Sequence, residues 1–387
     1  MRKLADCMSR LGTETAFEVL AKAKALEAEG KDIIHLEIGE PDFTTPDNIK
    51  EAAIKALRDG KTGYCPAPGI PELRKAIAAD AGKRRGVELD WKRVVVTPGA
   101  KPVMSHLIQA VAQPGDEVIY PNPGFPIYES MIKFVGAKPV PMMLREERDF
   151  RFDPAEFRSL VTDKTKLIII NSPQNPTGGV LSKKDLEAIA EVAVEHDVYV
   201  LTDEVYINII YDGKHESILS FPGMAERAIL LDGFSKSYSM TGWRLGYGHF
   251  PEELVEHITR LNINTISCTS HFSQWGALEA ITGPQDAVAT MRDEFARRRE
   301  VIVKGLNDLP GVSCRMPGGA FYAFPNITGT GRTSKELEGD LLQKAGVATL
   351  SGTSFGSNGK GFLRLSYANS VENIRKALER IGNYLAG

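Results

Sequence analysis

Cysteine is scarce in this chain. Only four cysteines, Cys7, Cys65, Cys268 and Cys314, occur among its 387 residues, and they are far apart in the sequence. This spacing excludes the CxxC patterns that are typical of zinc sites and redox motifs. We therefore expect four ordinary reduced thiols.

Long apolar segments are missing as well. The strongest aliphatic run spans Leu167 to Ile170, whereas a membrane-spanning helix needs about 20 apolar residues. Residues Met1 to Arg10 carry charges throughout and have no apolar core, unlike a secretory signal. These absences favour the cytoplasm as the expected location.

The chain has no large excess of charge of one sign. Its formal net charge is −3 and its isoelectric point is near 6.2, so electrostatics give no reason to expect nucleic acid or an anionic membrane as a partner. No GxGxxG follows the first predicted strand, which disfavours a nicotinamide oxidoreductase. A cofactor-sensing transcriptional regulator would need an added DNA-binding module, and the chain has no room for one before residue 30.

The chain does contain a regular alternation of two hydrophobic patterns. Short β-branched runs predict buried strands at Val94–Thr97, Glu117–Tyr120, Leu167–Asn171, Val198–Thr202 and Ile229–Leu231. Amphipathic patterns between them predict helices at Lys101–Val111, Ile127–Phe134 and Lys183–Glu195. This succession predicts an α/β fold of three layers, a mostly parallel sheet with helices on both faces. Ligands of such sheets bind beyond the carboxyl ends of the strands.

The last hundred residues have a different pattern. Asp286 to Gly305 predicts one long helix, Gly318–Phe324 and Gly361–Tyr367 predict strands, and a terminal helix is expected from Val371 onward. The break at Thr282-Gly283-Pro284 predicts the start of a smaller α+β domain. We thus expect an N-terminal arm over 1–47 that packs on the small domain, a large domain over 48–281 and the small domain over 282–387.

The segment from Gly233 to Gly246 carries the most chemical information. It follows a predicted buried strand and places Lys236 among small residues. A lysine in such surroundings can be desolvated, which lowers its pKa and frees its amine to form a Schiff base. Arg244 lies eight residues further on, and its planar guanidinium suits a phosphate. Taken alone, however, Lys236 is more often a solvated surface lysine.

Other strand ends carry residues with two possible interpretations. Asp203 is either a turn former or the partner of a buried cation. Val94 to Lys101 is a strand, a glycine turn and the start of a helix, which together form an anion site without the spacing of a P-loop. Arg364 lies on the alternating strand Phe362 to Tyr367 and is either an exposed residue or an anion clamp.

These segments together resemble class I/II aminotransferases that depend on pyridoxal 5′-phosphate, the family with the fold of aspartate aminotransferase (fold type I). Gly233–Gly246 resembles the family's cofactor-lysine signature at each fixed position, and the resemblance extends along nearly the whole chain. It implies that Lys236 carries the cofactor and acts as the catalytic acid and base. Asp203 would face the pyridine nitrogen, and Tyr206 would donate a hydrogen bond to the phenolic oxygen.

The resemblance also implies the remaining site residues. The further cofactor contacts would be Gly99, Ala100, Lys101, Phe125, Asn175, Ser235, Arg244 and, from the neighbouring subunit of a homodimer, Tyr64. The substrate's α-carboxylate would be held by Gly39, Asn175 and Arg364. Many relatives have a hydroxyl residue in place of Ala100, so backbone donors matter more here. Asn122-Pro123 and Asn175-Pro176 are candidate cis bonds.

The predicted reaction moves an amino group from an L-amino acid to a 2-oxo acid, with ping-pong kinetics. A carbon–sulfur β-lyase or a cyclising synthase on the same scaffold is the main alternative. The preferred amino acid stays open, because the side-chain pocket is built from scattered residues. Phe17 and Phe125 disfavour strict aspartate specificity, and Leu20, Ile38 and Tyr322 are further candidates for this pocket.

Overall fold

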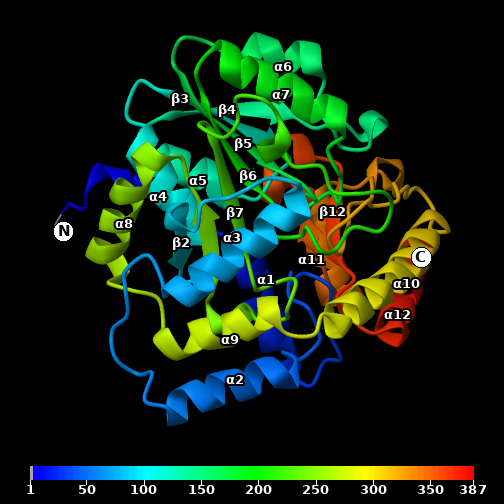
Figure 1. The fold of residues 1–387 in the computed structure, drawn as a ribbon. Coiled ribbons are helices and arrows are strands. Elements are labelled where there is room, and N and C mark those ends of the chain that lie inside the picture. Colours follow the sequence, from blue (N-terminus) through cyan, green and yellow to red (C-terminus); the bar gives the residue numbers. More distant parts are fainter. Residues whose placement is uncertain (1–2) are drawn as a thin grey trace.

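The centre of the molecule is a seven-stranded sheet (Figure 1), seen in a computed structural model that describes residues 3–387. Met1 and Arg2 of the predicted N-terminal arm lie outside the described residues. The strands, in their order across the sheet, are β2 (Val94–Thr97), β8 (Gly246–His249), β7 (Ala228–Gly233), β6 (Tyr199–Asp203), β5 (Thr165–Asn171), β3 (Glu117–Asn122) and β4 (Lys138–Met143). Strand β8 is antiparallel to both neighbours, and all other pairs are parallel. The predicted fold class is confirmed.

All five predicted strands of this sheet form, with ends shifted by up to two residues. Strands β4 and β8 were not predicted. Strand β4 contains Pro139 and Pro141, which its position at the edge of the sheet tolerates because an edge strand leaves some N–H groups unpaired. Strand β8 reads Gly-Tyr-Gly-His and lacks a β-branched run.

Helices cover both faces of the sheet (Figure 1), because successive side chains of its strands point to opposite sides. Val95 packs into a core with α4 (Lys101–Val111), α5 (Ile127–Phe134) and α8 (Glu252–Ile266). Val94 and Val96 face a second core on the opposite side. That core is formed by α1 (Thr15–Ala28), α2 (Asp47–Arg58), α3 (Pro71–Arg85), α6 (Pro154–Leu160), α7 (Lys183–Glu195) and α9 (His271–Thr282). The three helices predicted between the strands, α4, α5 and α7, form with the predicted bounds.

The C-terminal part has its own core and two small sheets. One sheet has the order β11 (Leu350–Ser351), β12 (Leu363–Ser366), β9 (Tyr322–Ala323), and it packs with α10 (Asp286–Asn307), α11 (Ser334–Asp340) and α12 (Val371–Ala386). In the other, β1 (Ile34–His35) pairs in parallel with β10 (Val347–Ala348), so the N-terminal segment is hydrogen-bonded to the C-terminal part. Helices α10 and α12 form as predicted, whereas β9 is shorter than the predicted strand because a turn at Ala320 and Phe321 precedes it, with Ala320 at φ +57°.

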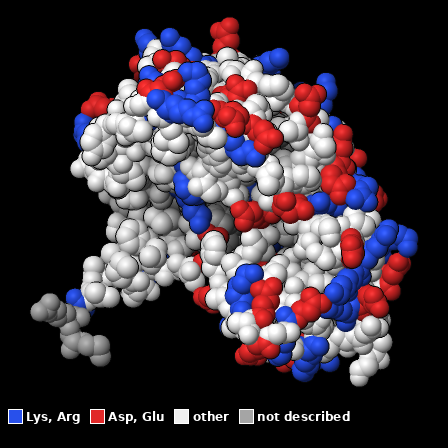
Figure 2. Space-filling view, turned by 90° about the horizontal axis from the view of Figure 1, so that it is seen from below, with Lys and Arg blue, Asp and Glu red and all other residues white. Residues whose placement is uncertain are grey.

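The surface carries charges of both signs, interspersed over much of the face in Figure 2. An area almost free of charged side chains lies on the side from which the N-terminal end projects. Large apolar side chains are exposed in the N-terminal segment, among them Leu4, Met8 and Leu11. Within residues 3–387, no helix has the length and apolar character that crossing a membrane requires.

Candidate active site

A cavity of about 590 Å³ opens at the carboxyl ends of the parallel strands. Strands β2, β3, β5, β6 and β7 each end in a loop that contributes lining residues, and the loop before β8 contributes Arg244. The predicted site residues that line this cavity are Gly39, Ala100, Lys101, Phe125, Asn175, Asp203, Tyr206, Ser235, Lys236, Arg244 and Arg364. The structure thus brings together residues from seven separate segments of the chain.

Lys236 follows β7 and points into the cavity. Its Nζ donates a hydrogen bond of 2.6 Å to the carbonyl oxygen of Gly39. Burial lowers the pKa of Lys236 to about 8, although the carboxylates of Glu40 and Glu14 favour the charged form. A substantial fraction of this amine is therefore neutral near pH 8, which is what a nucleophile or a general base requires.

Asp203 is the last residue of β6 and is buried. Burial raises the pKa of its carboxyl group to about 7. The hydroxyl of Tyr128 donates a hydrogen bond of 2.5 Å to Oδ2, and the backbone N–H of Val205 donates to Oδ1 at 3.3 Å. These donors leave the carboxylate without a cationic partner, so a buried cation beside it would restore the ionised form.

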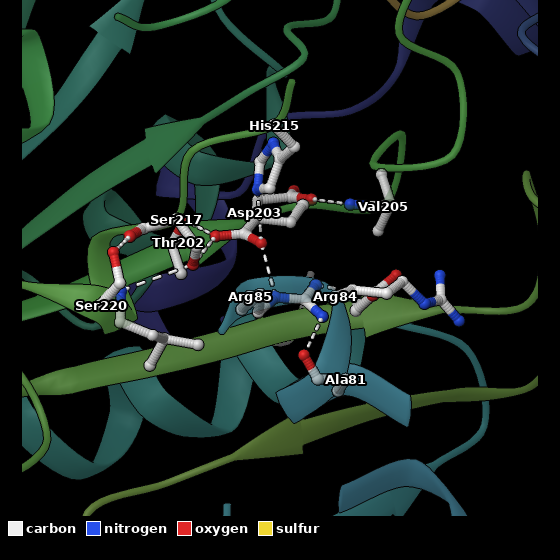
Figure 3. Close-up of polar contacts among 12 residues, drawn as sticks. Ala81, Arg84, Arg85, Thr202, Asp203, Val205, His215, Ser217 and Ser220 are labelled. Carbon is white, nitrogen blue, oxygen red and sulfur yellow. Dashed lines mark hydrogen bonds and ion pairs between the residues drawn. The ribbon is translucent and has the colours of Figure 1, made fainter. Parts of the chain in front are cut away.

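A buried ion network that includes Arg85 and His215 lies near Asp203 (Figure 3). Arg85 bridges Glu204 and Asp232, with Nε–Oε2 and Nη2–Oδ2 distances of 2.7 and 2.9 Å, and all three side chains are almost fully buried. Burial alone would raise the pKa of Glu204, but Arg85 and His215 hold it well below its usual range. The network therefore keeps two further negative charges next to Asp203.

Tyr206 and Tyr322 form a hydroxyl pair in the cavity, with 2.7 Å between their Oη atoms. Burial raises the pKa of Tyr206 well above its usual value, and the neighbouring Tyr322 adds to this shift. Both rings are thus neutral hydrogen-bond donors. Tyr322 also lies against Gly39. A Cβ atom on Gly39 would lie 2.2 Å from the Tyr322 hydroxyl oxygen, so only glycine fits there.

A turn of small residues joins β2 to α4 and lies against the Arg244 guanidinium. A Cβ atom on Gly99, which has φ +82°, would lie 2.3 Å from Nη2 of Arg244. Gly99 itself is not among the residues lining the cavity, whereas Ala100 and Ser235 are. The first free N–H groups of α4 and the cationic Arg244 together make this corner suitable for a phosphate.

Arg364 and Asn175 are hydrogen-bonded to each other at a different part of the cavity. Arg364 is buried, and its Nη1 donates to Oδ1 of Asn175 at 3.1 Å. Its Nη2 donates to the carbonyl oxygen of Glu37, while its Nε is buried without a partner. A buried guanidinium with an unused donor is suited to hold a carboxylate.

Phe125 and Lys101 lie together at the side of the cavity. Lys101 Nζ is 5.6 Å from the centroid of the Phe125 ring and forms an ion pair with Glu14. The two predicted cis bonds, Asn122-Pro123 and Asn175-Pro176, are both present, and Ser172-Pro173 is a third, unpredicted one.

Besides Gly99, two residues of the sequence interpretation are absent from the lining of the cavity. Tyr64 is 89% exposed, and it is not among the residues that line the cavity around Lys236. Leu20 is also absent from the lining, whereas Phe17, Ile38 and Tyr322 belong to it.

Sequence reasoning missed several residues that contact the predicted ones. Tyr128, on α5, bonds Asp203, and Glu14, before α1, pairs with Lys101. No local motif marks either residue, because each reaches its partner only through the fold. Glu204 had a usable signal, since a second carboxylate directly after Asp203 at the end of a buried strand needs a buried cation.

Comparisons with known proteins agree on one class. Residues 31–381 match the family described as aminotransferase class I and II. The chain is 44% identical to the probable aspartate/prephenate aminotransferase of Aquifex aeolicus and 43% identical to aromatic-amino-acid aminotransferase 2 of Thermococcus litoralis, covering 98% and 91% of this chain and 98% and 92% of those proteins. The aspartate aminotransferase of Thermus thermophilus with maleate superimposes with a TM-score of 0.95 at 38% identity, over 99% of this chain and 100% of that one.

The fold and the comparisons define a transferase of fold type I that moves amino groups. The chain belongs to the class I and II aminotransferases, whose members use pyridoxal phosphate. The cavity fits this group, because it combines an anion corner, an aromatic face, a buried carboxylate and a half-buried amine. Because Gly99 has no Cβ atom, the Arg244 guanidinium can lie directly against the turn, which keeps the proposed phosphate site compact.

Proposed function

We propose that this aminotransferase moves the amino group of an L-amino acid to a 2-oxo acid in a ping-pong reaction, with Lys236 as its catalytic acid and base. The observation that carries the proposal is that the half-buried amine of Lys236, with a pKa of about 8, lies in one cavity with Asp203, Arg244 and Arg364. Bound pyridoxal phosphate supplies an electron-accepting ring that delocalises the charge formed at the substrate's Cα.

Asp203 is proposed to hold the ring nitrogen protonated. Its carboxyl loses hydration on burial, so it gains most from a cation placed directly against it. The Glu204 and Asp232 carboxyl groups lie nearby, both paired with Arg85, and Arg85 helps to hold the pKa of Glu204 well below its usual range. Tyr206 and Asn175 are proposed to donate to the phenolic oxygen, and Phe125 to cover one face of the ring.

Arg364 is proposed to bind the substrate's α-carboxylate through its guanidinium, together with Asn175 and the backbone of Gly39. Holding the carboxylate directs the Cα–H bond toward Lys236. The Nζ of Lys236, once released from its contact with Gly39, would take the proton from Cα as general base and give it up again as general acid. Ser235, Arg244 and the backbone of Gly99, Ala100 and Lys101 are proposed to hold the phosphate.

We also propose a division into an arm of residues 1–47, a large domain of 48–281 and a small domain of 282–387. The pairing of β1 with β10 supports contact between the arm and the small domain, and the end of α9 at Thr282 supports the second boundary. A cytoplasmic location stays a prediction.

A homodimer is proposed in which Tyr64 reaches the neighbouring active site. The exposed Tyr64 ring and the almost uncharged area beside the exposed apolar N-terminal segment support this assembly, because interface cores are depleted of charge.

The proposal is tested by mixing the cofactor-loaded protein with L-amino acids and 2-oxoglutarate. We expect glutamate and the matching 2-oxo acid to appear in equal amounts, with parallel double-reciprocal plots. Lys236→Ala should abolish turnover, because no other half-buried amine of residues 3–387 lines the cavity close to Asp203. Release of pyruvate and ammonia from cystathionine, without amino transfer, would instead identify a β-lyase.

A further inference from the structure

The side of the cavity next to Phe125 holds an ion pair between Glu14 and Lys101. Both residues line the cavity, and they come from segments that are far apart in the sequence: Glu14 directly precedes α1, and Lys101 begins α4. Glu14 does not cap its own helix with its side chain. Its carboxylate instead pairs with Lys101 at the wall of the cavity.

Glu14 faces the place where a substrate would bind. Besides burial, its carboxylate is among the charges that act on the pKa of Lys236 and on that of Arg364. Glu14, Lys236 and Arg364 line the same cavity, so the Glu14 carboxylate, the amine and the proposed carboxylate clamp border one binding space. A substrate held by Arg364 would thus extend its side chain into the field of Glu14.

Among residues 3–387 of this chain, four cations line the cavity. Three of them already have proposed roles: Lys236 as the catalytic acid and base, Arg244 at the cofactor phosphate and Arg364 at the substrate's α-carboxylate. Lys101 is the one left to meet a second, distal carboxylate of a substrate. Its charge is already matched by Glu14, whose side chain is only 18% exposed.

On the basis of the proposed function, we infer that Glu14 is a specificity-determining residue that selects against amino acids with a second carboxylate, by keeping Lys101 in an ion pair. A dicarboxylic substrate can bind Lys101 through its distal carboxylate only if the ion pair between Lys101 and Glu14 breaks. The Glu14 carboxylate would then be poorly hydrated and would lie close to another negative charge. An uncharged side chain meets no such obstacle. It finds apolar neighbours in Phe17, Ile38, Phe125 and Phe355. The enzyme therefore favours amino acids with uncharged, aromatic or aliphatic side chains.

The test compares L-aspartate with L-phenylalanine in the half-reaction, in which loss of the visible absorbance of the cofactor-loaded protein is followed after mixing. This format avoids a dicarboxylic 2-oxo acid as second substrate. Glu14→Gln keeps the size of the side chain and removes its charge. We expect the ratio of second-order rate constants, aspartate over phenylalanine, to rise by at least about tenfold. In this variant the distal carboxylate of aspartate is no longer repelled by Glu14, and Lys101 is free to bind it.

Two variants separate this effect from general perturbation. Glu18→Gln removes the same charge from an exposed position in the first turn of the same helix, outside the cavity, and should leave the ratio unchanged. The double variant Glu14→Gln/Lys101→Met should lose the gain for aspartate, since the receiving cation is gone. An unchanged ratio in Glu14→Gln, or a gain that persists in the double variant, would overturn the inference.

Calorimetric binding of succinate and of 3-phenylpropionate to the cofactor-loaded wild type and Glu14→Gln gives a second readout. We expect Glu14→Gln to tighten succinate by about tenfold while 3-phenylpropionate changes little. This comparison needs no turnover. It therefore judges the role of Glu14 even if no amino acid reacts, a result that would count against the proposed function instead. Equal tightening of both ligands, or of neither, would contradict the role of Glu14.

Discussion

Burial acts in opposite directions on the two groups at the centre of the site. It lowers the pKa of Lys236 to about 8 and raises that of Asp203 to about 7, because each group loses hydration of its charged form. A neutral amine is ready to accept a proton from carbon. A buried carboxyl instead needs a cation, and the protonated ring nitrogen of bound pyridoxal phosphate would supply one. The same physical cause thus prepares both groups for different tasks.

Removal of Arg364 should weaken substrate binding strongly. In Arg364→Ala we expect KM for amino acids to rise by at least about 100-fold, since a lost charged pair costs roughly 2–5 kcal/mol and each tenfold corresponds to about 1.4 kcal/mol. The matched control is Arg375→Ala, which removes an exposed arginine from α12 and should leave KM unchanged. Steady-state kinetics check both variants, and an unaltered KM in Arg364→Ala would remove this residue from the substrate site.

The residues that sequence reasoning placed best belong to short local motifs. Lys236 and Arg244 lie in one segment, and Asp203 ends a continuous apolar strand, so their neighbours in the chain indicate their surroundings. Tyr128 and Glu14 were not predictable in this way. Each acquires its partner from an element far away in the sequence, and the register of that contact is set by packing.

At the scale of elements, the site depends on where strands end. The carboxyl ends of five parallel strands and the start of the antiparallel β8 meet at one edge of the sheet, which gathers residues from distant loops. Apolar runs made β2, β3, β5, β6 and β7 predictable. Strands β4 and β8 were not predicted, because the prolines of β4 and the glycines of β8 interrupt the β-branched runs that usually indicate a strand.

The turn between β2 and α4 gives a prediction at this scale. Gly99→Ala would force a side chain into the left-handed region, at φ +82°, and into the Arg244 guanidinium. We expect the affinity for pyridoxal phosphate to fall by at least about tenfold, because the phosphate loses the fixed position of Arg244. A titration of the cofactor-free protein by absorbance measures this affinity.

Gly86→Ala is the control for backbone strain in that titration. Gly86 caps α3 with φ +66° and has open space around its Cα, so alanine there costs about 1 kcal/mol of stability without touching the cavity. Its affinity for the cofactor should match that of the wild type. An equal loss of affinity in both variants would mean that general destabilisation, and not the turn, is responsible.

At the scale of the whole molecule, two separate cores meet around the cavity. The large sheet positions Lys236 and Asp203, whereas Arg364 comes from the small C-terminal sheet, so the proposed substrate site would draw on both parts. The sequence predicted this arrangement coarsely, through the change of pattern near residue 282. It could not predict the pairing of β1 with β10, because a strand of two residues carries no periodicity.

A shared active site predicts complementation between two defective chains. We expect Tyr64→Phe to lower cofactor affinity by about tenfold, since a hydrogen bond to a charged group contributes roughly 1.5–3 kcal/mol. Co-expressed with Lys236→Ala, it should give mixed dimers in which one of the two sites is intact. Activity at limiting cofactor should then exceed the mean of the two parents. If each site is built from one chain alone, activity will equal that mean.

The central claim is that Lys236 is the residue to which the cofactor is attached. Reduction of the cofactor-loaded protein with borohydride, followed by proteolysis and mass spectrometry of the peptides, tests it most directly. The account predicts that the pyridoxyl label lies on Lys236 and that labelling is lost when L-amino acid is added before reduction. A label on Lys101 or on any other lysine, with Lys236 unmodified, would contradict the account.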